Sequence, residues 1–397
     1  MKSKNTLIIL FSFILSFLVF FGYTMQSYFP AITTAMILGL FIIMKQKTKI
    51  SINIQHFLWA LFALALAIEC LYSKAPSYTL SFILPLFFSI ILSMICANIN
   101  NNKWFKYFMY ASAIFGFIHV SCTIIYQIRP ELINPICKAI LKPSDYALNI
   151  YLMKYGGNPG ITGQTGINGW LISIFIGILS YWLFSSNTNL TLTKKMLLTL
   201  LLILSIIALI LTNKRSFIIF SATSIVLSYI LVNRRKNKQK VRTIIYYILP
   251  IIITTIIVSN NNFLVFDRFS DNGSDITSGR YNIYSVMMTS FNERPMFGIG
   301  TLSTISLINN LGHNIYLQVL CENGLFVFLF FIYIIINLLT KLKNNNDNYK
   351  KFSKYVIILF LLYGLTGNPL YTIQCYLLLL IVIGYICKSV KKRTYEK

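Results

Sequence analysis

Residues 196–232 read MLLTLLLILSIIALILT-NKR-SFIIFSATSIVLSYILV, and this stretch decides what kind of protein the chain forms. Two apolar runs, 196–212 and 216–232, flank a short polar turn that carries Lys214 and Arg215. Each run approaches the roughly 20 apolar residues that a helix needs to cross the hydrocarbon core of a bilayer. The stretch therefore predicts a membrane hairpin with two cations at its turn.

The same apolar pattern recurs along the whole chain. Of the 397 residues, 56% are apolar and only 11% are charged, and the mean hydropathy is +0.68. Soluble domains carry about 25% charged residues, so a soluble enzyme and a disordered chain are excluded. Seven cysteines in 397 residues are too few for a disulfide scaffold. The sequence predicts an all-α polytopic membrane protein, with residues 1–397 in a single membrane domain. We predict twelve spans, at residues 7–24, 28–44, 55–72, 78–97, 104–127, 167–185, 196–212, 216–232, 243–259, 324–340, 354–367 and 371–387.

The basic residues set the orientation of these spans. The formal net charge is +25, but the cations lie in short runs between apolar segments, which argues against a nucleic-acid binder. Twelve spans put both termini on one side, and that side holds 25 of the 35 basic residues while the other side holds 10. Cytoplasmic loops are the ones enriched in Lys and Arg. We therefore expect both termini in the cytoplasm.

The two long connections lie on the opposite, outer side. They are a first outer loop at 128–166 and a large outer loop at 260–323, and seven of the ten acidic residues fall on this side. The cytoplasmic loops are short and basic, and the chain has neither a phosphate-binding GxxxxGK[ST] loop nor an HExxH zinc motif. A functional site is therefore expected on the outer face.

Three outer positions carry residue types suited to chemistry. Lys214 and Arg215 lie at a membrane boundary, where an unpaired cation is costly. Arg280 opens the weakly amphipathic stretch 281–291, and a cation at a helix N-terminus opposes the helix dipole, so it calls for an anionic partner. His313 is the one histidine outside the predicted spans, and its ordinary pKa suits a general base. Each residue also has a plain structural explanation, as a hairpin end, a surface arginine or a packed histidine, and the residues alone leave both open.

A fourth candidate is the stretch 158–169, which reads NPGITGQTGING at the outer mouth of the sixth span. Its glycines permit close backbone approach, and its amides, Gln164 among them, can hydrogen-bond a hydroxyl-rich ligand. A flexible loop entering the membrane is the structural alternative. The stretch 364–369, GLTGNP, resembles it at the outer turn of the last hairpin.

Taken together, these elements resemble the O-antigen ligase and polysaccharide polymerase superfamily of bacterial membrane glycosyltransferases. The resemblance rests on the order and spacing of four motifs. They are Thr-x-x-Arg-Ser at 212–216, Gly-Arg-x-x-x-Tyr at 279–284, Pro-x-x-Gly-x-Gly at 295–300, and His-Asn-x-Tyr-Leu-Gln followed by Glu-x-Gly at 313–324. Twelve spans with a large outer loop before the last helices are also similar to this family. The motifs cover about 210–330, roughly a third of the chain.

The resemblance implies a glycosyltransferase that uses a polyprenyl-diphosphate-linked glycan as donor, with no cofactor. The catalytic residues implied are His313 as general base, with Arg215 and Arg280 on the diphosphate, since arginine binds phosphate bidentately and stays charged. The candidate substrate-binding residues are Lys214, Asn314, Tyr284, Gln164 and Arg268. No metal is implied: Asp271 and Asp275 are the nearest approach to a carboxylate pair, and no further ligands accompany them.

The resemblance also implies a place and partners for the protein. It points to the bacterial cytoplasmic (inner) membrane, to lipid-linked oligosaccharide and membrane lipid as ligands, and to a flippase and a chain-length regulator as protein partners, with no nucleic acid. Within the family, a polymerase joins repeat units of an O-antigen or capsular polysaccharide, whereas a ligase passes the finished glycan to a lipopolysaccharide core sugar. The stretches TGQTGIN and LTGNP look more similar to the polymerase branch. The alternatives are the ligase and, from another class, a lipid-linked-oligosaccharide flippase, which would carry charges deep within its spans and an internal repeat.

Overall fold

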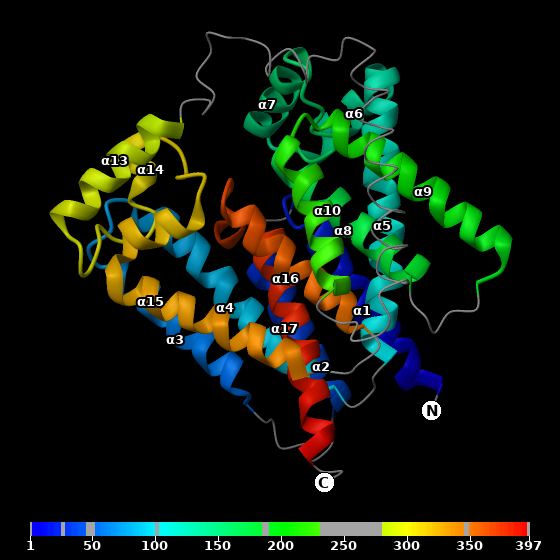
Figure 1. The fold of residues 1–397 in the computed structure, drawn as a ribbon, viewed down its shortest axis with the longest axis horizontal. Coiled ribbons are helices and arrows are strands. Elements are labelled where there is room, and N and C mark those ends of the chain that lie inside the picture. The colour runs from blue at the N-terminus through cyan, green and yellow to red at the C-terminus, as the bar shows by residue number, and fades with distance from the viewer. Residues whose placement is uncertain are drawn as a thin grey trace.

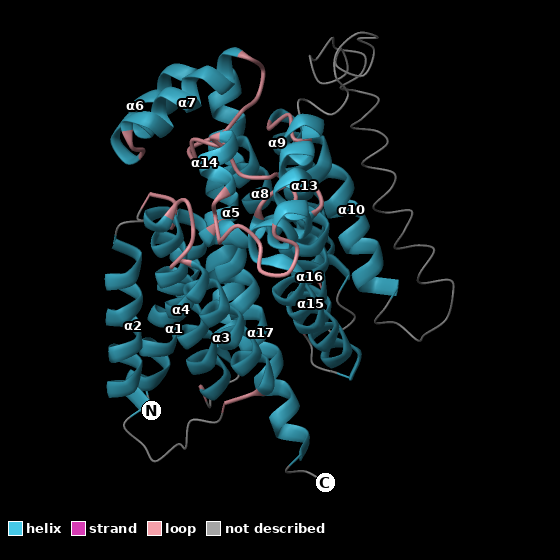
Figure 2. Cartoon of the chain, turned by 90° about the vertical axis from the view of Figure 1, so that its left-hand side faces the viewer, coloured by secondary structure: helices cyan, strands magenta, loops and turns pink. Residues whose placement is uncertain are grey.

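The computed structural model describes residues 2–24, 28–44, 52–99, 103–184, 190–230, 280–344 and 349–394, and within these ranges the chain is helical with no strand (Figures 1 and 2). The first half contains α1 (Lys2–Phe21), α2 (Phe29–Met44), α3 (Ile54–Glu69), α4 (Pro76–Asn98), α5 (Lys103–Ile128), α6 (Pro130–Ile140), α7 (Pro143–Lys154) and α8 (Thr165–Phe184). The second half contains α9 (Leu192–Leu211), α10 (Arg215–Ile230), α13 (Arg280–Glu293), α14 (Thr304–Ile308), α15 (Ile315–Asn344), α16 (Lys350–Gly364), the 3-10 turn η2 (Pro369–Tyr371) and α17 (Ile373–Thr394).

Eleven of the twelve predicted spans coincide with helices, and the ninth, at 243–259, lies outside the described residues. Five helices are long and apolar enough to cross a membrane by length and composition: α4, α5, α8, α9 and residues 315–342 of α15. Five shorter apolar helices accompany them, within α1, α2, α3, α10 and α17. The chain is therefore a polytopic membrane protein, and the exact count of twelve spans stays a prediction.

Two stretches differ from the loops that the sequence suggested. Helices α6 and α7 occupy most of 128–166, and each begins with a proline, a residue preorganised for the first turn of a helix. Helix α15 begins at Ile315 rather than at residue 324, because Asn314 caps it, and it continues past a kink at Gly324 (φ 74°, ψ 178°). The segment that follows His313 is therefore helical.

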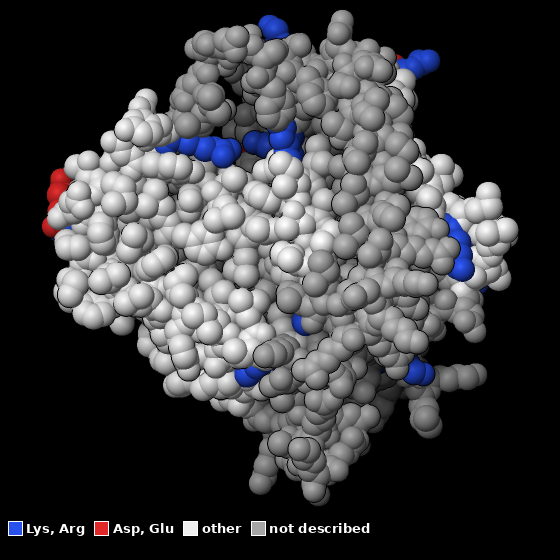
Figure 3. Space-filling model, viewed as in Figure 1, with Lys and Arg blue, Asp and Glu red and all other residues white. Residues whose placement is uncertain are grey.

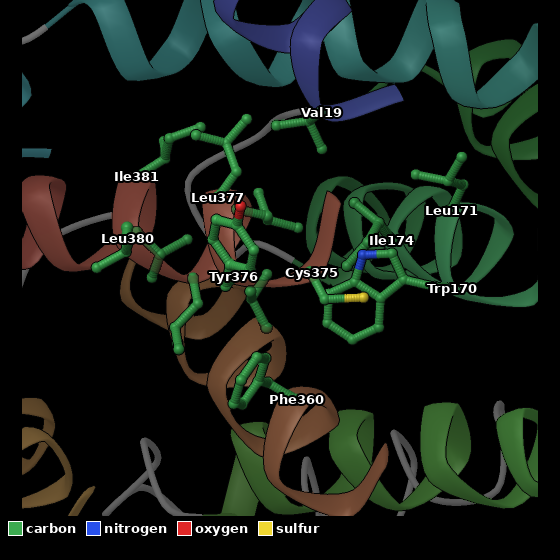
Figure 4. Packing of buried hydrophobic residues seen from close by; sticks show 14 of the residues in the cluster. Val19, Trp170, Leu171, Ile174, Phe360, Cys375, Tyr376, Leu377, Leu380 and Ile381 are labelled. Atoms are coloured by element: carbon green, nitrogen blue, oxygen red, sulfur yellow. The ribbon is translucent and has the colours of Figure 1, made fainter. Parts of the chain in front are cut away.

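The core lies where α17 meets α4, α1 and α16, with α8 packed against α5 and α16. Figure 4 shows Trp170, Leu171 and Ile174 of α8 and Phe360 of α16 gathered around the face of α17 between Cys375 and Ile381. Small residues let these helices approach closely, as is usual in membrane bundles. At Gly116, for example, an added Cβ would lie 2.6 Å from the Cβ of Phe175.

The outer helices of the bundle expose large apolar side chains instead of charges. Leu197 and Leu200 of α9 are 56% and 54% exposed, and Leu329 and Ile336 of α15 are 55% and 54% exposed. Exposed apolar side chains of this kind suit contact with lipid, since large apolar patches mark membrane or protein contact surfaces. In Figures 1 and 2, α1 begins and α17 ends toward the lower edge, whereas α6 and α7 lie at the top. Both ends of the chain thus point toward the same end of the bundle.

Candidate active site

The turn between α9 and α10 presents the first two cations. Asn213 adopts a left-handed conformation (φ 56°), which asparagine tolerates better than most residues. The buried Thr212 hydroxyl donates to Leu209 O at 2.7 Å and accepts from Lys214 N at 3.3 Å. The turn is thereby fixed, and the half-buried Lys214 and Arg215 follow directly at the start of α10.

The stretch 158–169 packs beside this turn and bonds to the end of α9. Asn158 N donates to Leu211 O at 3.0 Å, and its side-chain amide donates to Thr123 O at 2.8 Å. The Asn168 amide donates to Thr123 Oγ1 at 2.9 Å. Asn158 and Asn168 are buried, so their amides hold the bundle together instead of facing a ligand, and Gln164 is the exposed residue of the stretch that still presents an amide.

Helix α13 carries the third cation on its inner face. Arg280 is its first residue, and Arg280, Tyr284 and Met287 recur at helical spacing on one side. Met287 is fully buried, and its Cε lies 2.7 Å from the position that a Cβ on Gly312 would take. Because Met287 contacts Gly312, this face of α13 lies against the segment that carries His313. The weakly amphipathic stretch 281–291 lies within this helix.

His313 is held in an unusual backbone conformation immediately before α15. Its φ is 54°, a left-handed value that costs energy in a non-glycine residue and is commonly found at functional sites. On one side, Gly312 N donates to Gln318 Oε1 at 3.0 Å. On the other, the Asn314 Oδ1 accepts from Tyr316 N and Leu317 N at 3.0 and 3.1 Å, so this side-chain oxygen caps α15. His313 is therefore clamped between two fixed neighbours.

Lys214 of the turn and Arg280 of α13 lie near enough to His313 to influence its pKa. Burial lowers the pKa of His313 below its usual 6.5, and the nearby positive charges of Arg280 and Lys214 lower the pKa further. Figure 3 shows basic side chains gathered in this upper part of the molecule, over the region of α13 and α10. Three elements far apart in sequence thus place an imidazole whose charged form is disfavoured in the neighbourhood of two cations, a combination that suits a base working next to a bound anion.

The Pro-x-x-Gly-x-Gly and Glu-x-Gly motifs form a backbone clasp between the loop 295–300 and α15. Gly300 N donates to Glu322 O at 2.8 Å, and Leu325 N donates to Pro295 O at 2.9 Å. Gly298 has φ 67°, and a Cβ there would collide with the Glu322 carbonyl, so the close approach requires glycine. These two motifs therefore hold the connection after α13 onto the bundle.

The Glu322 carboxylate is fully buried and serves the same end of α15. Gln318 Nε2 donates to its Oε1 at 3.0 Å, and the Thr304 hydroxyl donates to the same oxygen. The Tyr371 hydroxyl donates to Oε2 at 3.0 Å. The Gln318 Oε1 in turn accepts a hydrogen bond from Gly312 N. A chain of hydrogen bonds thus runs from Glu322 through Gln318 to the residue before His313, and Glu322 itself makes no direct bond to His313.

Gln318 is a positioning residue that the sequence argument did not single out. The sequence does contain a signal for Gln318, because this residue ends the His-Asn-x-Tyr-Leu-Gln motif four residues before Glu322. The motif alone could not show that the Gln318 amide bonds to both Gly312 and Glu322, since the bond to Glu322 requires the segment to be helical. Spacing of four residues on one helix face then brings Gln318 and Glu322 together.

The remaining candidate residues are placed as follows. Tyr284 is half-buried on α13, and the other two histidines lie elsewhere: His56 shares a hydrogen bond with Ser93 Oγ at 3.1 Å and His119 with Phe20 O at 3.2 Å. Arg268, Asp271 and Asp275 lie outside the described residues. In the part of the chain that is described, no three His, Cys, Asp or Glu side chains cluster as a metal site would require.

Comparison with known families agrees with the geometry. Residues 200–332 match the family model described as O-antigen ligase, which is roughly a third of the chain. The matched stretch contains Lys214, Arg215, Arg280 and His313, and it also contains Gln318 and Glu322. A comparison with curated protein sequences gives no significant match.

Proposed function

Since residues 200–332 carry an O-antigen ligase domain, which supports membership of the O-antigen ligase and polymerase superfamily, we propose that the chain is a membrane glycosyltransferase. It polymerises the repeat units of a surface polysaccharide. The donor is a glycan linked to polyprenyl diphosphate, and the acceptor is a sugar hydroxyl of another lipid-linked repeat unit. The observation that carries this proposal is the placement of His313, which is held in a left-handed backbone conformation with Lys214 and Arg280 near enough to lower its pKa.

The chemistry follows from the charges of these groups. As the bond between the sugar C1 and the diphosphate oxygen breaks, negative charge develops on the diphosphate, and Arg215 and Arg280 stabilise it. The acceptor hydroxyl oxygen forms the new bond to C1, and its proton passes to His313. The lowered pKa keeps His313 neutral and able to accept that proton. The activated donor supplies the driving force, and the proposed reaction uses no metal and no cofactor.

A ligase is the second candidate, because the matching family model is described as O-antigen ligase. The same donor site serves both reactions, and only the acceptor differs. The flippase alternative is less well supported, because the cations near His313 lie at the ends of helices, at the start of α10 and of α13. A flippase would be expected to carry such charges along a path through the membrane.

The proposal places the protein in the bacterial cytoplasmic membrane, with both termini in the cytoplasm and the site on the outer face. The distribution of basic residues, 25 against 10, supports this orientation. Polyprenyl-diphosphate-linked oligosaccharide and membrane lipid are the ligands, and a flippase and a chain-length regulator are the protein partners.

The glycan profile of a deletion strain tests the function. Loss of a polymerase is expected to leave single repeat units on the surface acceptor, because ligation continues without chain growth. A strain that lacks a ligase would instead carry no glycan on that acceptor and would retain long polymer on the lipid carrier. The strain complemented with the wild-type chain is the control, and a normal profile in the deletion strain would exclude both activities.

The hydrogen-bond chain behind His313 gives a second test. Gln318→Leu is expected to lower kcat for glycan transfer on the order of 10²-fold, because a small displacement of a catalytic group has an effect of that size. KM for the donor should change little, since Gln318 holds Gly312 and not the arginines.

The matched control is Gln55→Leu. Gln55 is also buried and also bonds to α15, donating to Asn337 Oδ1 at 2.8 Å, but it lies far along that helix from His313. Both variants should lose similar thermal stability, measured as Tm in detergent, and only Gln318→Leu should lose kcat. Equal kcat in the two variants would show that Gln318 has no positioning role.

A further inference from the structure

Tyr363, at the end of α16, lies beside this site but outside the stretch that matches the family model. Its ring packs against Phe217 of α10, with centroids 4.5 Å apart, and against Trp170 of α8, with centroids 5.9 Å apart. Phe217 follows Arg215 by two residues. The ring is therefore fixed by the same helices that present the first cations.

The hydroxyl of Tyr363 makes no hydrogen bond to any described residue, unlike those of its neighbours. Tyr316 donates to Leu361 O at 2.8 Å, and Tyr371 donates to Glu322 at 3.0 Å. The Tyr363 side chain is half-buried, whereas the unpartnered hydroxyl of Tyr376 is fully buried. The Tyr363 hydroxyl is thus a polar group that makes no hydrogen bond within the described residues.

The surroundings of this hydroxyl point to an anion. Arg280 lies near enough to the Tyr363 hydroxyl for its positive charge to influence this group, as it influences His313. On the other side the oxygen faces the first turn of α8, where a Cβ on Gly166 would lie 3.3 Å from it. The N-terminal turn of a helix also favours negative charge. A phosphate oxygen between Arg280 and this turn would find a hydroxyl donor already in place.

We propose that Tyr363 is a further substrate-binding residue, whose hydroxyl donates a hydrogen bond to an oxygen of the donor diphosphate held by Arg280. This inference rests on the proposed function and adds to it a contact from a helix that the family motifs do not include. Hydrogen bonds to charged groups are stronger than those between neutral groups. Gly166 is part of the same arrangement, because a larger residue there would crowd the hydroxyl.

The test compares Tyr363→Phe with the wild type in lipid nanodiscs. The substitution keeps the ring and its packing on Phe217 and removes only the hydroxyl. We expect kcat/KM for a polyprenyl-diphosphate-linked donor to fall about 10- to 100-fold, the usual effect of losing a hydrogen bond to a charged group. Binding of polyprenyl diphosphate without glycan should weaken by a similar factor, and KM for the acceptor should not change.

Tyr316→Phe is the matched control, because Tyr316 is close by and its hydroxyl is bonded to the protein backbone. Donor binding in this variant should stay near the wild-type value. Unchanged binding of polyprenyl diphosphate in Tyr363→Phe, or an effect confined to the acceptor KM, would overturn the assignment. A wild-type protein that transfers no glycan would refute the proposed function instead, and the binding measurement would still decide the role of Tyr363.

Discussion

Replacing His313 with alanine is expected to lower the rate of glycan transfer about 10²- to 10⁴-fold, the usual contribution of a positioned general base. His313→Gln retains a hydrogen-bonding group but cannot take a proton at neutral pH, so it should be almost as inactive. The measurement is transfer from a lipid-linked donor by purified protein. His56→Gln is the control, since His56 is buried elsewhere in the bundle against Ser93 and should not affect the reaction.

The pH dependence of the wild type separates a base from a residue that only orients the substrate. A general base must be neutral, and the pKa of His313 is lowered below 6.5, so activity should persist below pH 6.5 and fall only as pH drops through the lowered pKa. Removing a nearby charge, as in Lys214→Met, should raise that pKa and move the acid limb to higher pH. If His313→Gln kept most of the activity and the acid limb, the role of His313 as a base would be excluded.

Arg280→Ala is expected to abolish polymer formation, with a loss of about 10²- to 10³-fold in transfer rate, because the diphosphate leaving group loses a preorganised cation. Arg215→Ala should behave similarly. Lysine at either position should restore little, since its point charge lacks the bidentate fork of arginine. Polymer length on gels and the amount of protein in the membrane are the two measurements.

Arg294→Ala provides the control for Arg280. Arg294 is an exposed arginine that follows the last turn of α13, at the other end of the helix that Arg280 begins. It should tolerate the substitution with near-normal polymer. Arg280→Ala should also raise the pKa of His313, because Arg280 is one of the two cations that lower it. Polymer of normal length in Arg280→Ala would remove the diphosphate role from this residue.

The sequence by itself determined the membrane class, the positions of most helices and the residue types of the site. Hydropathy is a property of consecutive residues, so the apolar runs at 196–212 and 216–232 predict α9 and α10 without knowledge of their partners. The motifs likewise identified Arg215, Arg280 and His313, because each motif is local. The sequence could not distinguish an amide that binds a ligand from one that bonds to another helix. In the structure the side-chain amides of Asn158 and Asn168 both donate to Thr123 of α5.

Only the tertiary structure decided which of these groups meet. Arg280 and Lys214 lie near His313 because Met287 of α13 packs against Gly312, and because Asn158 bonds to the end of α9 just before the turn. Gln318 acts on the His313 segment only because α15 begins early enough to place it one turn before Glu322. Tyr363, which we propose as a donor contact, lies on a helix outside the stretch that matches the family model. Contacts between distant segments depend on how the helices pack together, and helix packing is set by the complementary shapes of side chains throughout the bundle rather than by any single stretch of sequence.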